Sequence, residues 1–436
     1  IGLVFGFFYL AIPVFTGVTF GKPVMLLPIP WFDFSVNTER LLPATPMGYN
    51  PDLGALMIGF LLPFPIILGG FLSSMLTIIA DPILYYHHMF PHYMFGSDTI
   101  TTQISNGFDF WMSFGIGTQL AIAAIGLTSV VGTLIRSRGQ ENTARRGSMA
   151  SVPAGRGDFP IWGAVGAWLL ATVGYVILNH KLVPNFPFWI IMFYGLIWTP
   201  LNSYISARMI ALTGSGVSFP FLSQAVVLRS GYTQPDIWFA PLPLNDYGGQ
   251  AQKFREIELT GTKFTSILKL EIFMLPLILA TSFLYWQFLW HTTEIPSAQF
   301  TFAQKMWPQS AVQTAIWTQI NAKGGASWAL DALKIPLIGW GFGIALIIFG
   351  ISKLLSLPLL FYYGFIGGIG NIPHTAVPMF LGALLGRYYF ARRFGMERWQ
   401  MYTPVLLAGF SCGVGLIGMA AIALALISKT VNYLPF

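Results

Sequence analysis

A glycine- and proline-rich segment, GGIGNIPHT, could bind a polar solute inside a membrane, and it lies between two short apolar stretches. Backbone N–H and C=O groups that leave a helix at membrane depth must face protein or a water-filled cavity. The ends of two half-helices would also present partial charges there. We therefore expect a substrate-binding site formed by Gly367, Gly368, Asn371 and His374. The alternative is close helix packing through small residues.

A second interruption, Thr213–Pro220, has the sequence TGSGVSFP and admits the same two interpretations. Acidic residues near apolar stretches are the next candidates, because acids inside a membrane mark ion pathways. Asp109 is at the start of an apolar stretch, where it could instead favour a helix N-terminus. Glu271 follows Lys269 by two residues, which favours a paired interfacial charge over a proton relay. The pair Glu256 and Glu258 completes this group of candidates.

A histidine-rich segment could hold a metal or a haem. His88 and His92 are four residues apart and His87 adjoins them, but Pro91 intervenes and no nearby Cys or carboxylate completes a tetrahedral set. The nearest acid downstream is Asp98. We expect interfacial packing of these side chains, with no metal and no other cofactor. A membrane enzyme or redox subunit that uses these histidines is the alternative.

Motifs of soluble enzymes are missing from the sequence. There is no GxxxxGK[ST], GxSxG, HExxH or CxxC. The chain has one cysteine, Cys412, so it can form no disulfide within itself. We expect no catalytic residues and no enzymatic activity.

The elements that must position these residues are long apolar stretches. Hydrophobic residues make up 55% of the chain and charged residues 9%, whereas soluble domains carry about 25% charged residues. About 20 apolar residues suffice to cross a bilayer. The stretches are Ile1–Phe20, Leu53–Ala80, Phe110–Ile135, Pro160–Leu178, Phe188–Leu212, Ile267–Trp290, Ile335–Leu357 and Tyr402–Lys429. They predict an all-α polytopic membrane protein with about 8–10 transmembrane helices, including broken or re-entrant ones.

Positive charge sets the predicted orientation. The segment Arg136–Gly157 contains five arginines and one acid, which places it in the cytoplasm. It divides the chain into a first bundle, residues 1–135, a linker, 136–157, and a second bundle, 158–436. With this orientation, we expect residues 292–333 to form an external segment at the membrane interface. The basic residues flank apolar stretches, so membrane orientation accounts for the net charge of +7. We therefore expect no nucleic-acid partner.

Parts of the second half of the chain resemble the oligopeptide transporter superfamily, which includes metal-chelate carriers and bacterial relatives of unassigned substrate. The segment Asn245–Leu270 resembles the superfamily's cytoplasmic approach to a helix. Lys253, Gly261 and Lys263 hold comparable positions, although the Pro-Pro-Arg that ends that motif is absent.

Two further segments carry the resemblance. Tyr402–Met419 is similar to a late glycine-rich helix of the superfamily, with Gly409 and Gly413 in place but without its Glu. Ile295–Gln304 resembles an external segment of bacterial relatives. The resemblance implies proton-coupled uptake of peptides or metal chelates, and helices that precede residue 1.

These observations predict a secondary transporter that moves a small peptide, metal chelate or related solute by alternating access. The alternative is a non-catalytic structural subunit of a larger membrane complex. Expected partners are the lipid bilayer, a small solute such as a peptide, and further copies of the chain or other subunits. We expect the protein to be integral to a membrane, the bacterial inner (plasma) membrane.

Overall fold

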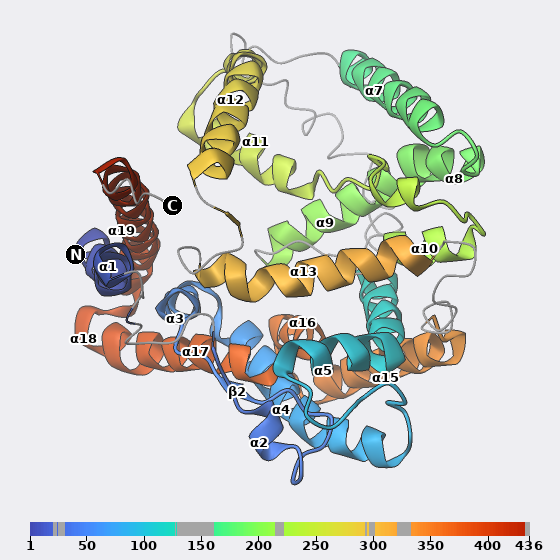
Figure 1. The fold of residues 1–436 in the computed structure, drawn as a ribbon. Coiled ribbons are helices and arrows are strands. Elements are labelled where there is room, and N and C mark those ends of the chain that lie inside the picture. The colour runs from blue at the N-terminus through green and yellow to red at the C-terminus, as the bar shows by residue number, and fades with distance from the viewer. Residues whose placement is uncertain are drawn as a thin grey trace. The chain divides into compact units, whose positions relative to one another are not determined.

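The described elements are almost all helical. The computed structural model describes residues 1–20, 24, 31–126, 128, 161–213, 222–292, 294–295, 301–320 and 333–431. Apart from one two-stranded antiparallel ribbon, every element in these ranges is a helix (Figure 1). The prediction of an all-α polytopic membrane protein is confirmed.

Seven of the described helices are long and apolar enough to cross a membrane, and two shorter apolar helices accompany them. The seven are Phe64–Tyr86, Thr99–Gly126, Trp162–Leu182, Phe188–Arg208, Phe264–His291, Ile335–Leu354 and Met396–Ala420. The two shorter ones are Gly2–Ile12 and Leu359–Gly368. Within residues 292–333, the structure describes a helix that is not among the seven.

Two compact units divide the chain. The first unit comprises Ile1–Met112, Phe288–Gln313 and Leu346–Phe436, and the second comprises Ser113–Gln287 and Thr314–Ala345. The division into residues 1–135, 136–157 and 158–436 remains a prediction about the course of the chain. Its basic linker lies outside the described residues.

The first unit is built around helices from both ends of the chain. Its elements are α1 (Gly2–Phe20), β1 (Phe32–Asp33), α2 (Ser35–Thr38), β2 (Gly48–Tyr49), α3 (Leu53–Leu61), α4 (Phe64–Tyr86), α5 (Thr99–Asn106), η1 (Gly107–Trp111), α16 (Leu359–Gly368), α17 (Pro373–Leu384), η4 (Leu385–Phe390), α18 (Ala391–Phe394) and α19 (Met396–Val431). In Figure 1 the blue α1 runs beside the dark red α19, and α17 passes α3. Segments far apart in sequence therefore form the core of this unit.

The second unit contains the middle of the chain. Its elements are α7 (Ile161–Leu182), α8 (Phe188–Phe193), η2 (Tyr194–Trp198), α9 (Thr199–Thr213), α10 (Leu222–Arg229), η3 (Pro235–Trp238) and α11 (Gly248–Thr260). Within the described ranges, four helices contribute residues to both units: the helix Thr99–Gly126, α12 (Phe264–Thr292), α13 (Thr301–Ile320) and α15 (Ile335–Leu354). The core of the unit packs Tyr194 and Ile191 against Val183, Val227 and Ile237.

The predicted span Leu53–Ala80 is two helices rather than one. Helix α3 ends at Leu61, and α4 begins at Phe64 after Pro63, whose backbone is extended (φ −58°, ψ 131°). Proline lacks an N–H and disfavours helical backbone in the residue before it, so the two prolines of LPFP interrupt the helix. Helix α4 then continues past Ala80 to Tyr86.

Glycines allow α4 and α16 to pack backbone to backbone. A Cβ atom added to Gly364 would overlap the carbonyl oxygen of Ile66, and one added to Gly69 would overlap that of Phe361. Gly368, one turn after Gly364, fits in the same way against Gly70 and Ser73. Such small-xxx-small spacing is typical of close helix pairs in membranes, where packing replaces the hydrophobic effect as the driving force.

A second close pair joins the two ends of the chain. Cβ atoms added to Gly2 and Gly6 of α1 would overlap backbone carbonyls of α19, and one added to Gly413 would overlap the carbonyl of Leu3. Gly409 lies against the same part of α1. Gly409 and Gly413 of the late helix therefore serve close packing, and their partner is α1.

We predict that Gly364→Ala will destabilise the protein by about 1–3 kcal/mol, because the added methyl group must push α4 and α16 apart. The matched control is Gly367→Ala in the same helix, since a Cβ at that position meets nothing within 4 Å. Thermal unfolding in detergent, followed by circular dichroism, measures both. Equal melting temperatures for the two variants would contradict the backbone contact.

Candidate functional site at a broken helix

The helix is broken where the sequence predicted a break, between α16 and α17. Ile369 leaves the helix with extended backbone (φ −64°, ψ 130°), and Gly370 follows at φ +75°. Only glycine adopts this left-handed conformation without strain. Ile372 is again extended, as expected for a residue before proline, and Pro373 opens α17.

Side chains from two other helices hold the freed backbone groups of the break. The Gly370 N–H donates to Thr77 Oγ1 of α4 at 3.2 Å, and the Gln103 amide donates to the Gly370 carbonyl at 2.9 Å. Ser74 Oγ lies 3.4 Å from the Gly368 carbonyl, which it approaches as a weak donor. The break is therefore a supported structure in which polar backbone is matched by the buried Thr77 and Ser74 and the half-buried Gln103.

Three of the four predicted site residues lie together at this break. The Asn371 side-chain amide donates to the Gly367 carbonyl at 2.7 Å, and both residues are exposed. Gly368 is buried against α4. The exposed pair Gly367 and Asn371 thus presents a carboxamide and a helix-end carbonyl at the break, whereas Gly368 serves helix packing.

His374 has a different environment, although it is only three residues further on. Its side chain is 5% exposed, and its ring centroid lies 5.5 Å from that of Trp31. A Cβ added to Gly48 would come within 2.8 Å of the His374 ring, so strand β2 passes directly over it. His374 therefore packs the start of α17 against the ribbon segment, which comprises β1, β2 and the residues between them.

The ribbon segment is fastened to the start of the helix Thr99–Gly126 by one carboxylate. Asp33 Oδ1 accepts the Ser35 N–H at 2.9 Å, and Oδ2 accepts the Thr99 N–H at 2.7 Å. Burial acts to raise the pKa of Asp33, but these hydrogen bonds outweigh it and hold the pKa below its ordinary value. The negative charge also suits a helix N-terminus.

A buried acid next to the break was missing from the sequence prediction. Asp81 is 1% exposed within α4, and the Trp111 indole N–H donates to its Oδ1 at 3.0 Å. The same indole ring covers the break, because a Cβ added to Gly370 would lie 2.9 Å from its ring carbons. The signal was present in the sequence: an aspartate directly follows a long apolar stretch and precedes more apolar residues.

The predicted acid Asp109 is not at a helix start. It is 4% exposed inside η1, a π-helical turn in the helix Thr99–Gly126. It accepts the backbone N–H of His92 at 3.0 Å, and His92 Nδ1 lies 2.7 Å from its other oxygen. Asp109 therefore does not serve a helix N-terminus, the alternative that its sequence position offered. The helix begins after Asp98, whose side chain accepts the Thr101 N–H at 2.9 Å.

The other candidates are exposed side chains. His87 and His88 are exposed, and no group of three His, Cys, Asp or Glu residues within the described ranges could hold a metal ion. Glu271 is exposed on α12, and Glu256 is exposed on α11, where Gln252 donates to it. Glu258, also exposed, pairs with Arg255. The second predicted interruption, 213–220, falls outside the described residues after Thr213.

We predict that Asp33→Asn will reduce stability at neutral pH and that this difference will vanish in acid. A carboxylate with a lowered native pKa stabilises the fold above its unfolded value, about 3.9, and loses this effect as pH falls through the native pKa. Melting temperatures of wild type and variant, measured in detergent from about pH 7 to about pH 2, should therefore converge below about pH 4. A constant difference across this range would contradict the role of the carboxylate.

We further predict that His92→Leu will destabilise the protein by about 1–3 kcal/mol, because it removes a hydrogen-bond donor from the buried Asp109 carboxylate. His92→Gln, which keeps a donor, is the control and should recover part of the loss. Thermal unfolding in detergent measures both variants. If Leu and Gln are equally harmful, the ring's size rather than its hydrogen bond matters.

Comparison with known proteins identifies no relative. The chain matches no protein-family model, and neither a curated protein nor a solved structure is significantly similar to it.

Proposed function

We propose that this protein is a secondary transporter that moves a small peptide, metal chelate or related polar solute across the bacterial inner membrane by alternating access. The observation that carries the proposal is the broken helix α16–α17, whose exposed Gly367 carbonyl and Asn371 amide lie at the break. Broken helices that meet near the middle of a membrane are the usual binding elements of secondary transporters.

The chemistry of the break suits a solute with amide groups. Asn371 can donate through its NH2 group and accept through its oxygen, as a peptide bond does. The hydrogen bond to Gly367 lies within one segment, so a bound solute can replace it without breaking a contact between helices. The positive φ of Gly370 lets the chain change direction at this point.

Asp81 gives the proposal a candidate coupling group. Acids inside membrane helices are costly and usually serve ion or proton pathways. Asp81 is buried in α4, and Trp111 contacts both Asp81 and the break. A conformational change at the break can therefore alter the surroundings of Asp81 through Trp111. The resemblance to oligopeptide transporters in Asn245–Leu270 and Tyr402–Met419 points the same way.

A structural subunit of a larger membrane complex is the second candidate. It is favoured by α12, a long apolar helix of which no residue in the most apolar part is buried within the described structure. Lipid alone can cover such a helix, but so can a further copy of this chain or another subunit. Native gel electrophoresis after mild detergent extraction distinguishes a single chain from an assembly.

We predict that proteoliposomes carrying the protein will accumulate labelled di- to hexapeptides or metal chelates, and that a proton gradient will increase the initial rate. Asn371→Ala should lower this rate about tenfold, as expected when one or two solute hydrogen bonds are lost. Gln252→Ala is the matched control, because Gln252 is also an exposed amide that bonds four residues away within its own segment. It should transport like wild type.

The outcomes separate the two candidate functions. Uptake that Asn371→Ala reduces and Gln252→Ala leaves unchanged supports a transporter that uses this break. Uptake that neither variant changes removes the break from the transport path. No uptake of any peptide or chelate by protein that remains folded and is part of a stable assembly would favour the structural subunit.

A further inference from the structure

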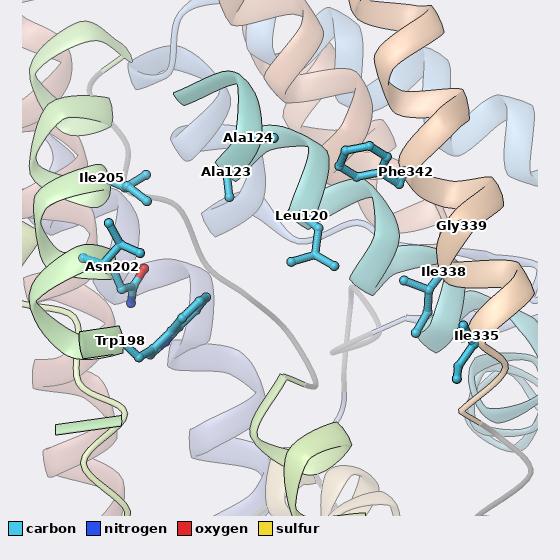
Figure 2. Close-up of a pocket in the computed structure, with 11 residues that line it drawn as sticks. Leu120, Ala123, Ala124, Trp198, Asn202, Ile205, Ile335, Ile338, Gly339 and Phe342 are labelled. Atoms are coloured by element: carbon cyan, nitrogen blue, oxygen red, sulfur yellow. The ribbon is translucent and has the colours of Figure 1, made fainter. Parts of the chain in front are cut away.

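A cavity in the second unit lies between three of the candidate membrane spans. Its volume is about 540 Å³, which is in the range of ligand-binding pockets. The walls come from the helix Thr99–Gly126, from the helix Phe188–Arg208 and from α15 (Figure 2). The lining residues are Leu120, Ala123, Ala124, Trp198, Leu201, Asn202, Ile205, Ile335, Ile338, Gly339 and Phe342.

Each helix contributes a single face to the cavity. Counted from the first lining residue of each helix, the others follow after three, four or seven positions, the period of one helical side. Almost all of these side chains are hydrocarbon. Hydrocarbon walls offer water few hydrogen-bond partners, and apolar cavities of about 150 Å³ are known to take up apolar ligands, so the lining favours an apolar occupant.

The helix Thr99–Gly126 and α15 are already in backbone contact, so the cavity cannot close by a further approach of these two walls. A Cβ added to Gly117 would overlap the carbonyl of Ile338, and one added to Gly341 would overlap that of Phe114. The Lys334 N–H also donates to Ser113 Oγ at 2.9 Å, at the start of α15. By contrast, a Cβ added to Gly339 meets nothing within 4 Å, because this glycine faces open space.

One polar group interrupts the apolar lining. Asn202 is 7% exposed, and its side-chain oxygen accepts no hydrogen bond within the described structure. Its side chain points from α9 toward the helix that bears Leu120 (Figure 2). A buried carboxamide oxygen without a donor is unfavourable, and a ligand with a donor group would satisfy it.

We propose that this cavity binds a single-chain lipid that carries a hydroxyl group, with the hydrocarbon chain against the apolar walls and the hydroxyl donating to Asn202. Acyl chains are the solvent of membrane-spanning helices, so a hydrocarbon chain is available to enter the site. This site is separate from the broken helix and belongs to the other unit. It does not depend on the proposed transport.

The test uses full-length protein in detergent and two photoreactive probes, a 16-carbon alcohol with a diazirine on its chain and the methyl ether of the same molecule. The alcohol can donate to Asn202 and the ether cannot. Mass spectrometry should locate the alcohol's label on the three lining helices. The ether should label these sites about fivefold less, the effect expected for one hydrogen bond.

Three variants make the result specific. Gly339→Phe fills the cavity and should abolish labelling of the lining by both probes. Gly343→Phe is the matched control, because Gly343 also faces open space but does not line the cavity. It should label like wild type. Asn202→Leu should bring the alcohol down to the level of the ether.

If Gly339→Phe folds poorly, Asn202→Leu still tests the site, because both probes are compared on the same folded preparation of one variant. Equal labelling of wild type by alcohol and ether would overturn the hydroxyl recognition. Labelling of the lining that survives in folded Gly339→Phe, or an absence of label from all three helices, would overturn the site itself.

Discussion

The structure of the first unit depends on one constraint: backbone that leaves a helix at membrane depth must find polar partners within the protein. The break at Gly370 meets this constraint through Thr77 and Gln103, which come from two different helices. These partners cannot be moved apart without leaving buried groups unsatisfied. The positions of α4 and of the helix Thr99–Gly126 relative to the break are therefore fixed by hydrogen bonds as well as by packing.

Glycine provides the second half of this arrangement. Gly69 and Gly364 bring α4 and α16 close enough for Thr77 and Ser74 to reach the break. Without such close contact, short hydroxyl side chains could not span the gap between two helices. Small residues thus contribute twice, first by packing and then by placing short polar groups near exposed backbone. The packing interpretation of the segment is confirmed for Gly368, whereas the substrate-binding interpretation of Gly367 and Asn371 stays a prediction.

Much of this fold could be predicted from the sequence, because apolar length and proline are strong local signals. The break before Pro373 and the late helix around Gly409 followed from composition alone. The details of the site did not, since Thr77 and Gln103 are far from Gly370 in sequence and nothing local links them. Asp81 shows the same division: an aspartate after a long apolar stretch is visible in the sequence, but its hydrogen bond from Trp111 arises only in the folded protein.

The position of Trp111 has a mechanical consequence. One side of its indole abuts Gly370, and its nitrogen holds Asp81. A hinge motion of α16 against α17 at Gly370 would press on the ring, and the ring cannot tilt without stretching its bond to the acid. The angle between α16 and α17 and the hydration of Asp81 would then change together, because Trp111 contacts both the break and the acid.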